Sequence, residues 1–186
     1  MLNRILIIGA SGSGTTTVGK RLAKELDFSH IETDDLFWLP VDPPFSQYRN
    51  QRELDEVLKT KVIAKGTWVL SGSPCVWGDV IIDLLDLVIF LIVPTEIRIE
   101  RISEREQKRF GRDIQAGGKL FEAHHNFLEW TKRYDIGDVT GRTKAMHEKW
   151  LSNLQCPVLK FENETDSNQV VKSVLNYIRN HSNEMI

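Results

Sequence analysis

The feature that most constrains this chain is a glycine-rich segment placed directly after a short apolar run. Residues 4–8 read RILII, and residues 9–17 read GASGSGTTT. The apolar run is typical of a central parallel strand that is buried on both faces. Residues 16–26 carry their apolar side chains at helical spacing. A strand, a glycine turn and an amphipathic helix in this order predict a loop whose backbone N–H groups hold phosphate.

This loop fits the P-loop motif G-x-x-x-x-G-K-[ST] with one departure. Thr16 occupies the position whose hydroxyl binds Mg²⁺, but Thr15 stands where the motif has lysine. The loop therefore keeps its backbone cradle and lacks the point charge that normally reaches the outer phosphates. Thr16 is the predicted metal ligand. The predicted nucleotide-binding residues of the loop are Gly9, Ser11, Gly12, Ser13, Gly14, Thr15, Thr16 and Thr17.

The rest of the chain alternates between strand and helix patterns. Further short strand patterns lie at residues 29–32, 67–70, 87–93 and 157–161, with helical patterns at 49–64 and 170–179. This alternation predicts a parallel sheet with right-handed crossovers, and hence a three-layer α/β/α fold. Residues 98–154 lack strand patterns. They predict a helical lid over the carboxyl edge of the sheet, within one domain of residues 1–186.

Two other interpretations of the glycine segment stay open. A Rossmann dinucleotide-binding loop also follows a first strand, and Glu32 lies at a suitable distance along the chain to hold a ribose. The glycine order G-x-x-G-x-G and the three consecutive threonines favour phosphate and metal instead. The other alternative is a glycine turn that merely joins a strand to a helix.

On these residues the chain resembles small P-loop kinases of the adenylate, gluconate and shikimate kinase kind. It is most similar to an uncharacterised bacterial group labelled adenylate kinase-like or AAA-family ATPase. The resemblance extends through residues 9–17, the Thr33-Asp34-Asp35 and Ser71-Gly72-Ser73 segments, an arginine-rich helix and the last strand. It implies a P-loop NTPase sheet of five parallel strands in the order 2-3-1-4-5. It also implies transfer of the γ-phosphoryl group of ATP, with Mg²⁺, to a small acceptor.

Phosphoryl transfer uses a carboxylate that accepts the acceptor's proton or holds Mg²⁺ through water. The resemblance gives this role to an Asp after the second strand, and we expect Asp35 to be catalytic and Asp34 to bind the substrate. Helix capping by Thr33 or Asp34 is the alternative. Gly72 and Ser73 match the turn that the family places against the acceptor, although an ordinary strand-ending turn explains them equally well.

Arginines spaced three or four residues apart predict a basic stripe on one face of the long helix. The stripe contains Arg98, Arg101, Arg105, Arg109 and Arg112. Arg101 and Arg105 match the arginines where the lid begins in adenylate kinase-like enzymes. We expect Arg105 and Arg109 to be catalytic, and Arg101 and Arg112 to bind the nucleotide, because guanidinium groups neutralise phosphate charge. A surface stripe paired with the interleaved glutamates is the alternative.

Charge and composition limit the partners. A formal net charge of −2 argues against nucleic acid as the main ligand and against binding to anionic membranes. The longest apolar run, residues 84–93, is too short to span a bilayer. Cys75 and Cys156 do not have metal-ligand spacing and fit a reducing compartment. We therefore expect a cytoplasmic protein that binds ATP, Mg²⁺ and a small-molecule acceptor.

Two further function classes remain open at this point. A nucleotide-binding regulatory module could have lost its chemistry together with the loop lysine. An NAD(P)-binding oxidoreductase would follow from the Rossmann interpretation. A metal site at His124, His125 and His147 is disfavoured, because adjacent histidines on a helix point to different faces.

Overall fold

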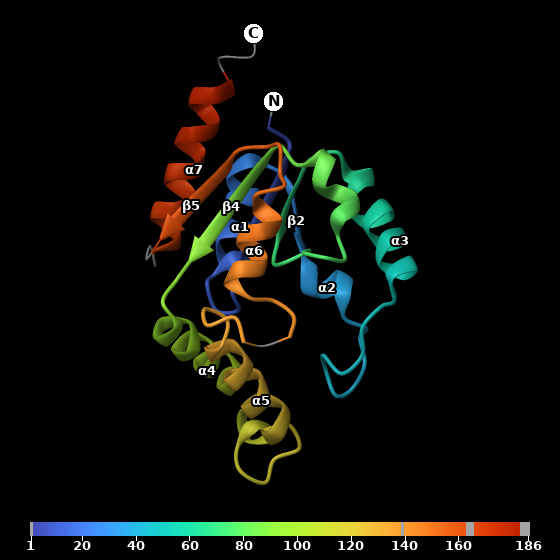
Figure 1. Cartoon of the computed structure of the whole chain (residues 1–186), viewed down its shortest axis with the longest axis vertical. Coiled ribbons are helices and arrows are strands. Elements are labelled where there is room, and N and C mark those ends of the chain that lie inside the picture. Colours follow the sequence, from blue (N-terminus) through green and yellow to red (C-terminus); the bar gives the residue numbers. More distant parts are fainter. Residues whose placement is uncertain (1, 139, 163–165, 183–186) are drawn as a thin grey trace.

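The computed structural model describes residues 2–138, 140–162 and 166–182, and its strands form one parallel sheet (Figure 1). The order is β2-β3-β1-β4-β5, which confirms the predicted 2-3-1-4-5 sheet. A Rossmann sheet has the order 3-2-1-4-5-6, so the dinucleotide alternative is not supported. The strands are β1 (Arg4–Gly9), β2 (Ser29–Glu32), β3 (Trp68–Ser71), β4 (Leu87–Ile92) and β5 (Val158–Glu162).

The central strand β1 explains why the sheet is covered on both faces. It pairs with β3 on one side and with β4 on the other. Its side chains alternate between two apolar clusters, with Ile5 and Ile7 in one cluster and Leu6 and Ile8 in the other. All four are fully buried. A continuous apolar run is what a strand buried on both faces needs.

Helices cover both faces and give three layers. The cluster around Ile5 includes residues of α1 and α7, and the cluster around Leu6 includes residues of α3 and α6. The α-helices are α1 (Thr15–Leu26), α2 (Thr33–Phe37), α3 (Gln51–Lys61), α4 (Thr95–Phe110), α5 (Phe121–Lys132), α6 (Lys144–Leu151) and α7 (Ser167–Ser182). The 3-10 helices are η1 (Ile63–Lys65), η2 (Asp79–Leu84) and η3 (Gly111–Ile114).

The segment predicted as a lid divides into two parts. Figure 1 shows α4 and α5 extending beyond the sheet on the side to which the β4 arrow points. In contrast, Trp150 and Leu151 of α6 are buried in the core with Phe90 of β4. The part that projects from the sheet is therefore α4 to α5, and α6 belongs to a covering layer. No helix within the described residues is long and apolar enough to cross a membrane.

Candidate nucleotide and acceptor site

The glycine loop has the backbone conformation that its sequence predicts. Gly12 has φ 81° and Gly14 has φ 96°, a region that residues with a Cβ rarely adopt. A Cβ on Gly12 would lie 2.5 Å from the carbonyl oxygen of Arg98, so this turn packs directly against α4. Helix α1 begins at Thr15 with no side-chain cap hydrogen bond from Gly14. The first N–H groups of α1 are therefore available to an anion.

The predicted metal ligand, Thr16, is joined to an acidic side chain at the end of β2. Its hydroxyl donates to Glu32 Oε2 at 3.1 Å, and Lys20 Nζ lies 2.7 Å from Glu32 Oε1. The sequence had suggested Glu32 only as a ribose partner in the dinucleotide alternative, whereas the structure places it beside the metal position of the loop. Lys20, whose side chain is mostly exposed, is thus ion-paired with Glu32.

The structure separates the two aspartates that follow β2. Both side chains are exposed to solvent, but Asp34 lines a cavity beside the loop, together with Glu32 and Thr33, and Asp35 is not among the lining residues. Loss of solvation raises the pKa of the Asp34 carboxyl, and the nearby charge of Arg142 partly offsets this rise. The geometry therefore favours Asp34 over Asp35 for contact with a substrate. The catalytic role itself stays a prediction.

Of the two predicted site residues in the turn after β3, only Gly72 lines the cavity. Gly72 lines the cavity and has φ 111°, and a Cβ there would collide with the Thr33 side chain. Ser73 is buried away from the cavity, and its hydroxyl lies 2.9 Å from His147 Nε2.

The other ring nitrogen of His147 lies 2.8 Å from the Tyr134 hydroxyl. Burial lowers the pKa of His147 to about 4, with a smaller effect from Arg142, so the ring is neutral at physiological pH.

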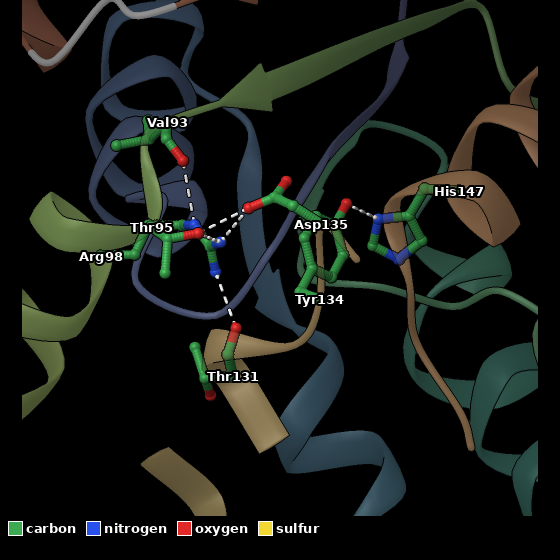
Figure 2. Close-up of polar contacts among 7 residues, drawn as sticks. All are labelled: Val93, Thr95, Arg98, Thr131, Tyr134, Asp135 and His147. Atoms are coloured by element: carbon green, nitrogen blue, oxygen red, sulfur yellow. Dashed lines mark hydrogen bonds and ion pairs between the residues drawn. The ribbon is translucent and has the colours of Figure 1, made fainter. Parts of the chain in front are cut away.

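Arg98, the first arginine of the predicted stripe, is fully buried and belongs to the base of the projecting segment (Figure 2). Its guanidinium donates to Val93 O at 2.9 Å and to the side chains of Thr95 and Asp135 at 2.7 and 2.6 Å. It also donates to Thr131 O at 3.4 Å, at the end of α5. Arg98 therefore ties the return of α5 to the start of α4.

The other stripe arginines do not act on a common face. Arg101 Nη1 lies 3.5 Å from two carbonyl oxygens of the glycine loop. Arg105 lines the cavity and also pairs with the neighbouring Glu106 carboxylate. Arg109 lies over two phenylalanine rings and Arg112 is exposed, and neither is among the residues that line the cavity. Arg101 and Arg105 thus lie near the loop and the cavity, whereas Arg109 and Arg112 do not.

Arg142 is a cavity residue that the sequence interpretation missed. It precedes α6, lines the cavity, and lies over the Trp130 ring with its Cζ 5.5 Å from the ring centroid. Its charge acts on Asp34. The only sequence signal is an arginine in a glycine-containing break, which is too common to identify a site. Glu32 had a better signal, because it ends a strand at the same sheet edge as the loop.

These groups surround one cavity of about 450 Å³, a volume within the usual range for a small-molecule site. The polar lining residues come mainly from the loop, β2 and the turn after β3. The apolar ones come mainly from the residues before α3 and from α4 to α5, which also contribute Arg105, Glu106 and His124 to the cavity. Its lining residues are Gly9, Ala10, Ser11, Gly12, Thr15, Thr16, Glu32, Thr33, Asp34, Trp38, Pro44, Phe45, Ser71, Gly72, Arg105, Glu106, Phe110, Ile114, Leu120, Ala123, His124, Phe127, Trp130 and Arg142.

The residues present fit a nucleotide with Mg²⁺. The Ser13 hydroxyl is buried in the loop and has no hydrogen-bond partner within the described chain. Thr16 and Glu32 offer the oxygen ligands that Mg²⁺ prefers, and this ion commonly takes only one or two protein ligands beside phosphate and water. Within the described residues there is no cluster of three His, Cys, Asp or Glu side chains that could hold a metal by itself.

Comparison with known proteins agrees with this fold and loop. The family described as AAA domain matches residues 5–124. The uncharacterised protein YqaC of Bacillus subtilis is 40% identical over 178 residues, which cover 96% of this chain and 98% of that protein. A shikimate kinase of Enterococcus faecalis is 30% identical over 156 residues, which cover 76% of this chain and 92% of that enzyme.

Among solved structures, the shikimate kinase of Aquifex aeolicus matches with a TM-score of 0.52 and 20% identity, over 96% of this chain and 98% of that chain. At this identity the match shows the fold alone. The family match extends from β1 into α5 and therefore includes the glycine loop and much of the cavity wall. The chain belongs to the AAA domain family and is a small P-loop kinase-like protein.

Proposed function

We propose that this protein is an ATP-dependent kinase that transfers the γ-phosphoryl group to a hydroxyl of a small acceptor. The observation that carries the proposal is that the glycine loop, Asp34 and Arg142 line the same cavity. The loop offers N–H groups to phosphate, the carboxylate offers a base, and the guanidinium offers positive charge. A glycine turn with a purely structural role needs neither of the other two groups.

The proposed reaction follows from these positions. The acceptor oxygen forms a bond to the γ-phosphorus while the bond from that phosphorus to the β–γ bridging oxygen breaks. The hydroxyl proton passes to the Asp34 carboxylate, and ADP leaves with the bridging oxygen. The raised pKa of Asp34 makes its carboxylate a better proton acceptor than an ordinary aspartate.

The metal position is assigned to side chains at the start of α1 and the end of β2. The Thr16 hydroxyl would bind Mg²⁺ directly, and Glu32 would hold it through water. The bound ion would neutralise charge on the β- and γ-phosphate oxygens.

In this proposal, the charge that Thr15 cannot supply comes from α4 and from the residues between α5 and α6. Lys20 is engaged with Glu32, whereas Arg105 and Arg142 line the cavity. A guanidinium held there can stabilise the transferring group in the way that electrostatic catalysis requires. Because neither arginine belongs to the loop, their contact with the phosphates depends on the positions of α4 and of the residues before α6.

Steady-state ADP formation from Mg·ATP, measured with a panel of small alcohols and hydroxy acids, tests the proposal. We expect one acceptor class to stimulate ADP formation and to yield one phosphorylated product for each ADP. ATP binding with no turnover for any acceptor would contradict the kinase and establish a nucleotide-binding regulatory module. Preferential binding of NAD(P) over Mg·ATP would contradict both.

A further inference from the structure

Part of the cavity wall next to α2 is aromatic. Trp38 and Phe45 line the cavity, with ring centroids 5.9 Å apart and planes at 78°. Phe45 is 40% exposed and has φ 63°, a conformation that bulky side chains rarely adopt. Such local strain is concentrated at functional sites, because the surrounding structure must compensate for it.

A second group of apolar lining residues comes from one side of α5. Ala123, Phe127 and Trp130 are spaced three or four residues apart and line the cavity. The rings of Phe127 and Trp130 are stacked, with centroids 6.3 Å apart and an interplanar angle of 20°. The Trp130 N–H donates to Thr140 O at 3.1 Å, so its polar atom is already engaged.

Two cation–π contacts of Arg109 connect Phe45 to the end of α4. The Arg109 guanidinium carbon lies 5.0 Å from the ring centroid of Phe45 and 5.0 Å from that of Phe110. Phe45 comes from the segment before α3 and Phe110 ends α4, and both line the cavity. Arg109 therefore joins Phe45 to the end of α4, and its predicted phosphate contact stays a prediction.

The chemistry of these walls selects among acceptors. A polyhydroxylated acid needs a hydrogen-bond partner for each hydroxyl, and unpaired polar groups are costly to bury. On α5 the only polar side chain that lines the cavity without an engaged polar atom is His124, whose Nδ1 has no partner among the described residues. Aromatic walls instead favour a flat ring, because every such ring presents a face for stacking.

Building on the proposed kinase function, we propose that the acceptor carries a planar aromatic ring that lies between Trp38 and Phe45 on one side and Phe127 and Trp130 on the other. The polar part of the acceptor then points toward Asp34 and the glycine loop. His124 is the polar side chain of α5 that meets the edge of the acceptor's ring.

Two phenylalanines of α5 provide a matched test. Phe127 lines the cavity, whereas Phe121 is partly buried outside it and stacks on His125. The probes are ring-bearing alcohols (nucleosides, nucleoside monophosphates and hydroxymethylpyridines) and ring-free or saturated ones (gluconate and glycerate), with shikimate as a non-aromatic ring. Their dissociation constants are measured by calorimetry in the presence of Mg²⁺ and a non-hydrolysable ATP analogue.

We expect at least one aromatic probe to bind more tightly than every non-aromatic one. Phe127→Ala should weaken its binding roughly tenfold or more, as loss of one stacking partner does, and Phe121→Ala should leave it unchanged. Preference for a non-aromatic probe, binding of none, or equal effects of the two variants would overturn the inference. Because the assay needs no turnover, loss of the kinase proposal would show separately, as aromatic binding without ADP formation.

Discussion

At the scale of single residues, small differences in position separate neighbours of the same type. Asp34 and Asp35 are adjacent on a five-residue helix, yet only Asp34 lines the cavity. Successive helical side chains point about a quarter-turn or more apart, so a shift of one residue decides which carboxylate meets the substrate. The sequence does not reveal how this short helix is rotated about its axis. It therefore could not show that Asp34, and not the predicted Asp35, lines the cavity.

Asp34→Asn should lower turnover by roughly two orders of magnitude, as expected for loss of a general base, and leave ATP affinity nearly unchanged. Asp35→Asn is the matched control and should retain the parent's rate. Initial rates and ATP dissociation constants are measured for both variants. Equal rates for Asp34→Asn and the parent would remove the carboxylate from the mechanism, and loss in Asp35→Asn alone would restore the assignment made from the sequence.

The same comparison can be made with two arginines. Arg142 lines the cavity, and Arg112 is exposed outside it. Arg142→Ala should reduce turnover by roughly two orders of magnitude, the effect of removing one positive group that stabilises transition-state charge. Arg112→Ala should have little effect on the rate. A large loss in Arg112→Ala with none in Arg142→Ala would show that the projecting segment binds the phosphates in another arrangement.

At the scale of elements, α4 and α5 form one projecting unit because both are attached at the same base. Arg98 is buried in that base and joins the end of β4, the first turn of α4 and the residues that follow α5 (Figure 2). Its own carbonyl oxygen packs against Gly12 of the glycine loop. The base of the projecting segment is therefore in direct contact with the proposed phosphate site.

Two aspartates after α5 test this base. Asp135 and Asp138 each lie 2.6 Å from an arginine, but Arg98 is fully buried and Arg133 is half exposed. Asp135→Asn should lower the free energy of unfolding by about 2 kcal/mol, because a buried guanidinium loses its carboxylate. Asp138→Asn should cost little, since exposed pairs contribute little. Urea unfolding measures both, and equal costs would contradict a structural role for the base.

The elements also show which features could be predicted from the sequence. The glycine loop, the buried β1 and the parallel α/β fold were predictable because a local motif and a strand-helix alternation determine them, whereas the strand order was implied by the resemblance to small P-loop kinases. The contacts of the stripe arginines were not predictable, because helical spacing does not reveal which elements surround each position. Arg98 faces the end of α5 and Arg109 faces Phe45, and both contacts join residues far apart in the chain.

At the scale of the whole molecule, one buried histidine links several parts of the fold. His147 of α6 bonds to Ser73 after β3 and to Tyr134 after α5. Its pKa is lowered from 6.5 to about 4, so the unfolded chain binds a proton where the folded chain does not. Stability that rests on the neutral ring is therefore complete above pH 6.5 and is lost as the pH falls toward 4.

The free energy of unfolding should accordingly decrease between pH 6.5 and pH 4 in the parent protein, and His147→Gln should flatten that decrease. His125→Gln is the control, because His125 is exposed on α5 and should leave the pH profile unchanged. Denaturant unfolding at several pH values gives the slopes. Identical slopes for the parent and His147→Gln would contradict the neutral buried ring.

The central claim is that residues 9–17 hold the phosphates of Mg·ATP at the edge of the cavity. Calorimetric titration of Mg·ATP into the parent and into Gly14→Val tests it most directly. Gly14 has φ 96°, so valine would both strain the loop and place a branched side chain where phosphate approaches. We predict a dissociation constant raised roughly a hundredfold or more, which corresponds to a loss of about 2.7 kcal/mol. A folded Gly14→Val protein that binds Mg·ATP with the parent's affinity would contradict the account.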